Sequence, residues 1–223
     1  MKEAQNIYQP IIDYFERVAA LNETEKDLVK ELFTYHSFKR KEFLLREREI
    51  CNKFCFIIKG CMRMYMIDEK GTTHILQFAA ENWIIVDALS FRQRTASNLS
   101  IDTLEASEVL YITPENLKLL YEKAPIFNYI IRDLLEKHLT TIQRRLLQYM
   151  SSTGEERYLA FLKTYAQFAN RLPQTRIAAY LGITPEHLSK IRKDITKPRH
   201  FISEDTLRVR GTGLFYICII KLK

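Results

Sequence analysis

The sequence of 223 residues contains few cysteines and no long hydrophobic run. Four cysteines in a chain of this length do not make the disulfide framework of a small secreted domain. No apolar stretch is long enough to cross a bilayer, and residues 1–4 lead into polar sequence rather than into a secretory signal. We therefore expect a cytoplasmic protein without a membrane partner.

The five histidines are scattered along the chain. His36 and His74 stand alone, and no His-x-His pair occurs. A transition-metal site needs several such ligands at one point, and no nucleophile–base set is evident either. We expect no metal, no cofactor and no enzyme activity. A metal-dependent enzyme built on a β-roll is the alternative from that class.

Three of the cysteines, Cys51, Cys55 and Cys61, lie close together in sequence but inside or between expected strands. An iron–sulfur cluster needs four thiolates gathered at one site, and Cys218 is far away along the chain. We expect buried core thiols here rather than a redox centre.

The net charge of +7 is concentrated in the C-terminal part of the chain. Residues 1–129 contain 17 Lys and Arg against 19 Asp and Glu, whereas residues 130–223 contain 17 against 8. The net charges of the two parts are therefore −2 and +9. A basic segment attracts phosphate backbones by releasing counterions, which favours nucleic acid as the partner. A small-ligand-binding module that acts through protein partners alone is the alternative.

Residues 173–193, PQTRIAAYLGITPEHLSKIRK, have the pattern of two short helices joined by a glycine turn. We expect Pro173 to open the first helix and Gly182 to end it in the left-handed conformation. We expect Thr184 to cap the second helix, with Pro185 as its first residue. This arrangement predicts a helix-turn-helix.

The preceding sequence predicts an α+β fold. Residues 7–35 have helical spacing, and residues 38–112 contain short β-rich runs separated by turns, among them a hairpin turn at Asp68–Gly71. Many short strands without alternating helices favour an antiparallel, jelly-roll-like β-roll. A hairpin expected over residues 206–222 would be a wing beside the helix-turn-helix or a tail folded elsewhere.

A long helix is expected from Pro125 to Met150, with apolar residues at steps of three and four. An apolar stripe of this length needs a partner, and a second copy of the same helix is the simplest one. We therefore predict three parts: a sensor domain over residues 1–124, a dimerisation helix over 125–150 and a DNA-binding domain over 151–223. The stripe consists of Phe127, Ile131, Leu135, Leu139, Ile142 and Leu146.

The order of these parts resembles that of the Crp/Fnr family of transcription regulators. The resemblance rests on IIKGCMRMYMIDEKGTTHILQF (57–78), on LEASEVLYITPENLKLLYEKAP (104–125) and on residues 173–193. In the family, the first stretch forms consecutive strands of a cyclic-nucleotide-binding-type roll, with glycines where Gly60 and Gly71 stand. The resemblance implies a homodimer that binds a near-palindromic site on double-stranded DNA and contacts RNA polymerase.

The resemblance also implies roles for residues of the helix-turn-helix. The family's base-reading positions fall on Pro185, Glu186, Ser189 and Lys190, and proline has no side-chain donor or acceptor to read a base. Direct readout would then use Glu186, Ser189 and Lys190, because these side chains can bond to base edges. Residues suited to phosphate contact or positioning are Thr175, Arg176, Thr184, Arg192 and Lys193.

Relatives that bind a cyclic nucleotide use a Gly-Glu pair for the ribose and an arginine for the phosphate. Here Val86-Asp87 stands near the first place, and Ser97 falls at the place of the arginine. Arg94 and Thr95 resemble the phosphate motif but come three residues too early. We therefore expect an unknown effector, or none, rather than a cyclic nucleotide. Residues of a possible effector pocket are Trp83, Asp87, Arg94, Thr95 and Ser97.

Overall fold

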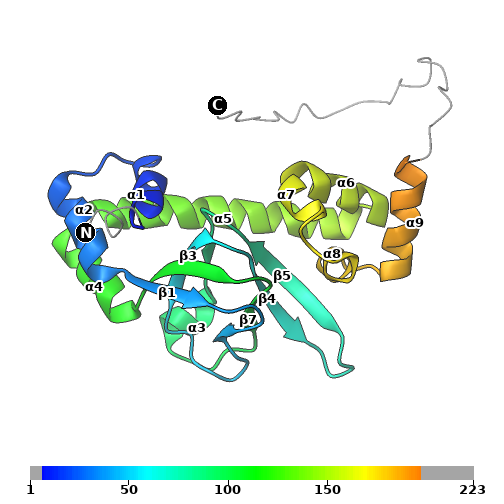
Figure 1. Ribbon diagram of the computed structural model, residues 1–223, viewed down its shortest axis with the longest axis horizontal. Coiled ribbons are helices and arrows are strands. Elements are labelled where there is room, and N and C mark those ends of the chain that lie inside the picture. The colour runs from blue at the N-terminus through cyan, green and yellow to red at the C-terminus, as the bar shows by residue number, and fades with distance from the viewer. Residues whose placement is uncertain (1–6, 197–223) are drawn as a thin grey trace, which may run out of the picture.

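Two four-stranded antiparallel sheets form a β-roll in the computed structural model of the chain, which describes residues 7–196 (Figure 1). In each sheet an early strand pairs with a late one, as in a jelly roll. The first sheet has the order β1 (Thr34–Phe38), β8 (Ser107–Ile112), β3 (Phe54–Lys59) and β6 (Ile84–Ile85). The second has the order β2 (Phe43–Leu45), β7 (Ser100–Thr103), β4 (Met62–Ile67) and β5 (Thr73–Ala79).

The hairpin between β4 and β5 forms at the predicted turn. Gly71 has φ +79°, a conformation that glycine adopts without steric cost. The carboxylate of Asp68 accepts hydrogen bonds from the backbone N–H groups of Lys70 (3.0 Å) and Thr72 (2.8 Å). These local contacts fix the register in which Met62 faces Ala79, and the predicted roll is confirmed.

Helices cover one end of the roll and extend beyond the other (Figure 1). The helices of the N-terminal part are α1 (Gln9–Glu16), α2 (Glu23–Leu32), α3 (Ala88–Gln93), α4 (Pro114–Lys123) and α5 (Ile126–Ser151). The C-terminal part, which we call the reader segment, contains α6 (Gly154–Thr164), α7 (Ala166–Ala169), α8 (Gln174–Leu181) and α9 (Pro185–Thr196). None of the helices in residues 7–196 is both long and apolar enough to cross a membrane.

Several predicted boundaries were wrong. Tyr35 lies in β1 rather than in a helix, because its backbone pairs with Leu110 of β8. Residues 88–91, the end of an expected β-rich run (82–91), lie in α3 instead, because the side chain of Asp87 caps the backbone there. Pro173 is the N-cap of α8 and not a helical residue, since its ψ is 143°. The hairpin expected over residues 206–222 lies outside the described residues.

The long helix α5 begins directly after Pro125 and runs along the roll to the reader segment (Figure 1). Its first turns belong to the core formed by the β-roll and the N-terminal helices, which we call the sensor core. There the ring of Phe127 lies 5.5 Å from that of Phe15 in an edge-on contact. Two residues of the predicted dimer stripe, Phe127 and Ile131, are therefore buried within their own chain. The prediction that these two face a second copy was wrong, because the roll and α1 cover this end of the helix.

Candidate nucleic-acid interface and sensor region

The turn between α8 and α9 is formed by local backbone contacts. Gly182 ends α8 with φ +66°, and the backbone N–H of Ile183 donates to the carbonyl of Ala178 at 3.1 Å. The hydroxyl of Thr184 accepts from the backbone N–H of His187 at 3.2 Å, which caps α9. The predicted glycine turn and N-cap of the helix-turn-helix are both present.

The two helices are held together by apolar side chains that face each other and α6. Ala178 is buried, and its small side chain allows α9 to come close to α8. Leu188 and Ile191 of α9 are buried in the same cluster. Gly154 at the start of α6 lies under α9, where an added Cβ would be 3.5 Å from Ile191. This packing fixes which face of α9 points away from the protein.

The outward face of α9 carries the predicted base-reading residues. Glu186 and Lys190 are exposed, and Ser189 is half-buried. Together they offer a carboxylate acceptor, a hydroxyl and an ammonium donor on adjacent turns. These residues line one shallow hollow, together with Pro185, Lys193 and Asp194. Sequence reasoning did not single out Asp194, although its place four residues after Lys190 puts it on the same face.

The predicted positioning residues surround this face. Thr175 of α8 is exposed and Arg176 is half-buried, as is Arg192 on the side of α9. Thr184 is exposed, but its hydroxyl oxygen already accepts the capping hydrogen bond. Thr184 therefore positions the start of α9 through its backbone contact, whether or not DNA is present.

Two of the predicted effector residues are bonded to each other inside the roll. The hydroxyl of Ser97 donates to Oδ2 of Asp87 at 2.5 Å, and Oδ1 of Asp87 accepts from the backbone N–H of Leu89 at 3.1 Å. Both side chains are buried. The Asp87 carboxylate thus caps α3 and also accepts from Ser97. Ser97, at the place of the phosphate-binding arginine, offers a neutral hydroxyl where a phosphate needs a cation.

The other predicted effector residues point elsewhere. The guanidinium of Arg94 donates to the carbonyl of Cys51 at 3.3 Å, and the carbonyl of Thr95 accepts from the Ser90 hydroxyl at 2.6 Å. Trp83 packs away from Asp87, against Tyr165 of the reader segment. The structure therefore does not bring Trp83 together with the others, because the indole belongs to the contact between the two parts of the chain.

Cys51, Cys55 and Cys61 of the β-roll are buried thiols. Burial raises the pKa of Cys61 to about 12 and also raises the pKa of Cys51 and Cys55. A thiol with a raised pKa stays protonated and is a poor nucleophile and metal ligand. Within residues 7–196 no group of three potential metal-ligating side chains comes together.

Beyond the sensor core, α5 carries an uncovered apolar stripe. Leu135, Leu139, Ile142 and Leu146 are each 48–58% exposed, in contrast to the buried Phe127 at the start of the helix. Met150, one turn after Leu146, continues the stripe and is 76% exposed. Four of the six predicted stripe residues are therefore available to a partner.

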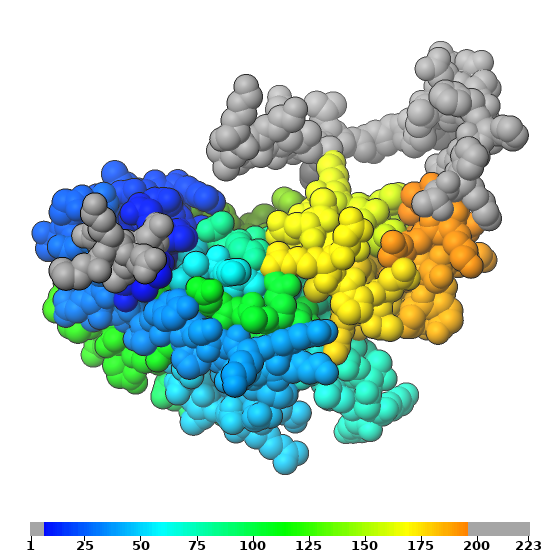
Figure 2. Space-filling view, in the orientation of Figure 1, coloured from blue at the N-terminus to red at the C-terminus, as the bar shows by residue number. Residues whose placement is uncertain are grey.

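The reader segment docks on the outer face of the second sheet (Figure 2, where α7 and α8 are yellow). We call this contact the docking interface. The ring of Phe78 on β5 lies 5.8 Å from Phe168 and 5.3 Å from Tyr180. The ring of Trp83 lies 5.4 Å from Tyr165 and 6.0 Å from Phe168. Aromatic pairs at these distances stabilise beyond their buried area, so the interface holds α8 against the sensor.

An ion-pair cluster closes one side of the docking interface. The guanidinium of Arg171 donates to both carboxylate oxygens of Glu81, at 2.6 and 2.9 Å, and also bonds the carboxylate of Glu105. The Glu81 carboxylate further accepts from the backbone N–H of Gly60 at 2.9 Å. The hydrogen bonds from Arg171 lower the pKa of Glu81 to about 2. The cluster therefore joins the sensor to the reader by charge as well as by aromatic packing.

Comparison with known proteins agrees with this geometry. Residues 35–124 match the family described as the cyclic nucleotide-binding domain. No curated protein sequence matches the chain significantly. The fold is similar to that of the c-di-GMP-responsive global regulator CLP from Xanthomonas campestris (14% identity, TM-score 0.65, covering 78% of this chain and 91% of that chain).

Two further solved structures have the same arrangement. FixK2 from Bradyrhizobium japonicum is similar at 19% identity and a TM-score of 0.63, covering 74% of this chain and 84% of that chain. A candidate transcriptional regulator of the Crp/Fnr family from Eubacterium rectale is similar at 18% identity and a TM-score of 0.60, covering 82% and 87%. Likeness at these identities establishes a shared fold, and the predicted Crp/Fnr-type architecture is confirmed at that level.

Proposed function

We propose that this chain, with its cyclic nucleotide-binding-type roll and Crp/Fnr-type fold, is a sequence-specific DNA-binding transcription regulator. The observation that carries the proposal is the outward face of α9. Glu186, Ser189 and Lys190 lie there side by side, on a helix whose opposite face is buried. CLP and the candidate regulator from Eubacterium rectale, which share this fold, are described as regulators, which agrees with this role.

Each of the three side chains has a chemically defined target in the major groove. The Glu186 carboxylate can accept from the amino group of cytosine, and the Lys190 ammonium can donate to O6 and N7 of guanine. The Ser189 hydroxyl can bond to a base or to a phosphate. The basic surroundings, with Arg176 and Arg192 on the flanks, would supply the phosphate contacts that position α9 without specifying a base.

We further propose that the regulator is a homodimer. The exposed stripe of α5 from Leu135 to Met150 supports it, since a second copy of the same stripe would cover these side chains. Two recognition helices related by a two-fold axis would read a near-palindrome. Its half-sites would lie about one helical turn, roughly 34 Å, apart.

We propose that the sensor does not respond to a cyclic nucleotide. The hydrogen bond between Ser97 and Asp87 supports this, because Ser97 stands at the place of the phosphate-binding arginine and offers no cation, and its hydroxyl already donates to Asp87. Arg94, the nearest arginine in sequence, donates to a backbone carbonyl instead. Saturable thermal stabilisation by cyclic AMP or cyclic GMP would contradict this part of the proposal.

Selection of binding sites from random duplex DNA tests the main proposal. The full-length protein should enrich a palindromic site, and a Glu186→Ala, Lys190→Ala double variant should not. Lys118→Ala, an exposed change on α4 far from α9, is the matched control and should enrich the same site. Failure of the unaltered protein to enrich any palindrome would contradict the proposal.

A further inference from the structure

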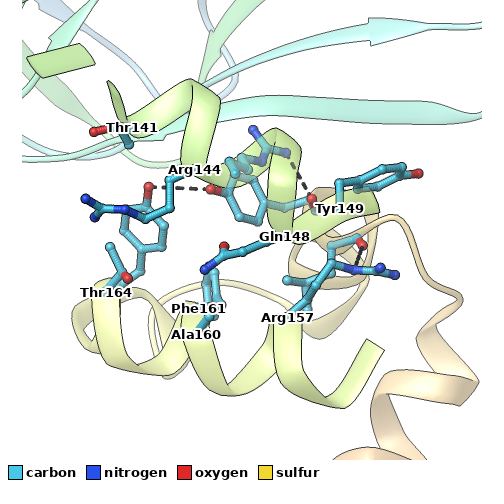
Figure 3. A pocket seen from close by; sticks show the side chains of 12 residues that line it. Thr141, Arg144, Gln148, Tyr149, Arg157, Ala160, Phe161 and Thr164 are labelled. Atoms are coloured by element: carbon cyan, nitrogen blue, oxygen red, sulfur yellow. Dashed lines mark hydrogen bonds between the residues drawn. The ribbon is translucent and has the colours of Figure 1, made fainter. Parts of the chain in front are cut away.

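A second basic site lies at the junction between α5 and the reader segment, away from the outward face of α9 (Figure 3). It is a hollow of about 70 Å³ between α5, α6 and α8. Three arginines contribute to its walls: Arg144 and Arg145 of α5, and Arg157 of α6. We call it the arginine hollow. Its volume exceeds that of one water, since a single water occupies roughly 10–15 Å³ by the same measure.

Two of the arginines are fixed in place by neutral partners. The Arg157 guanidinium donates to the carbonyls of Leu181 at 3.1 Å and Ser152 at 2.8 Å. The Arg145 guanidinium donates to the carbonyls of Tyr180 at 3.0 Å, Ile75 at 2.9 Å and Leu76. A carbonyl satisfies a donor but does not neutralise its charge. Both guanidinium groups therefore keep their full positive charge beside the hollow.

No carboxylate lines the arginine hollow among the described residues. Arg144 extends from α5 toward Thr164 of α6, and its guanidinium has no hydrogen-bond or ion-pair partner within residues 7–196 (Figure 3). The hydroxyl of Thr164 and the side-chain amide of Gln148 add neutral donors to the same space, whereas the Thr141 hydroxyl donates to the carbonyl of Lys137 at 3.0 Å. Concentrated positive charge with unused donors is the chemistry that binds a phosphate group.

The arginine hollow stays accessible in the proposed dimer. Arg144 follows Ile142 by two residues, which places it about 200° further round the helix and so on the side opposite the apolar stripe. The hollow is also separate from the DNA-reading face, because its walls come from α5, α6 and α8 and include no residue of α9. A ligand there would compete neither with a second copy nor with base readout.

We propose that the arginine hollow binds a small phosphate-bearing anion, with Arg144 as the ligand-binding residue. Arg145 and Arg157 supply fixed charge, and Thr164 supplies a hydroxyl donor. The bound anion would contact α5 on one side of the Ser152–Thr153 joint and α6 on the other. It would thereby stiffen the connection between the sensor core and the reader segment.

Inorganic phosphate is the probe that tests the site. Phosphate should raise the melting temperature of the full-length protein in a saturable way, with sodium chloride used to hold the ionic strength constant. Arg144→Gln should weaken the phosphate affinity at least about tenfold, because it removes the one unpaired cation. Isothermal titration calorimetry on both proteins measures the same loss directly.

Arg132→Gln is the matched control, since Arg132 is an exposed arginine on the same helix outside the hollow. It should bind phosphate as the unaltered protein does. Absence of saturable binding by the unaltered protein would overturn the proposal, as would equal binding by Arg144→Gln. A loss of DNA affinity in Arg144→Gln with phosphate binding unchanged would assign this residue to the DNA backbone and would also overturn it.

Discussion

Gly182 is the single residue on which the turn of the helix-turn-helix depends most directly. Its φ of +66° lies in the left-handed region, which favours glycine. It also lies close to the end of α5, where an added Cβ would be 2.7 Å from Cε2 of Tyr149. A side chain at this position therefore meets both backbone strain and a steric clash.

We expect Gly182→Ala to lower the free energy of unfolding by about 2 kcal/mol, since the left-handed conformation alone costs roughly 1–2 kcal/mol. Urea denaturation followed by circular dichroism measures the change. Gly71→Ala is the control, because its φ is also positive but an added Cβ would meet nothing within 4 Å. A larger loss in Gly71→Ala than in Gly182→Ala would show that the clash with Tyr149 is unimportant.

Lys190 and Arg192 should differ in what they contribute to DNA binding. Lys190→Ala should cost roughly 1–3 kcal/mol of affinity for the selected site and relax the preference at one base pair. Arg192→Ala should weaken binding to all sequences alike, because phosphate contacts carry no base information. Titration with the selected duplex and its single-base variants separates the two effects. A base-selective loss in Arg192→Ala would show that its role was misassigned.

At the scale of the element, the two halves of α5 differ in their surroundings: the first half is buried and the second is exposed. Its first turns, with Phe127 and Ile131, complete the sensor core. Its later turns expose apolar side chains from Leu135 onward. Apolar residues recur at steps of three and four in both halves of α5. Whether they are buried or exposed therefore depends on what packs against the helix.

Leu139→Glu should convert the proposed dimer to a monomer, because it places a charge in the middle of the apolar stripe. Analytical ultracentrifugation should then give the mass of one chain. Thr140→Glu is the control: Thr140 is exposed and lies two residues from Ile142, on the opposite side of the helix. This variant should remain dimeric, and a dimeric Leu139→Glu would contradict the proposed use of the stripe.

At the scale of the whole molecule, the docking interface links the sensor to the reader. Arg171 joins Glu81 and Glu105, and Trp83 packs on Tyr165 and Phe168 beside them. Trp83 is the only tryptophan in the sequence. Its fluorescence therefore reports whether the reader segment is docked.

Arg171→Gln should shift the emission of Trp83 to longer wavelength at neutral pH, since it removes the cation of the cluster. The pKa of Glu81 is held at about 2 in the folded chain, below its ordinary value of 4.5. A carboxyl group whose pKa is lowered by folding stabilises the folded state fully above pH 4.5, and this stabilisation is lost as the pH falls toward 2. The difference in Trp83 emission wavelength between Arg171→Gln and the unaltered protein should therefore be constant above about pH 5 and shrink at lower pH.

Arg132→Gln, which breaks only an exposed pair with Glu136, is the control and should leave the emission unchanged. Emission identical in Arg171→Gln and the unaltered protein across this pH range would show that the aromatic contacts alone hold the reader segment.

The sequence by itself determined the features that depend on neighbouring residues. The hairpin turn at Asp68–Gly71, the N-cap Thr184 and the glycine at 182 were all predicted correctly. Each of these features is built from backbone geometry and hydrogen bonds within about four residues, so the local pattern is sufficient. The helix-turn-helix and the face of α9 follow from them.

Only the tertiary structure decided how distant segments meet. It assigned Trp83 to the docking interface, buried Phe127 within its own chain, and joined Ser97 to Asp87. It also brought Arg171 to Glu81, which lies 90 residues earlier in the chain. An apolar or charged residue has the same local pattern whichever partner it finds. Its partner is set by the packing of whole elements, which no short stretch of sequence contains.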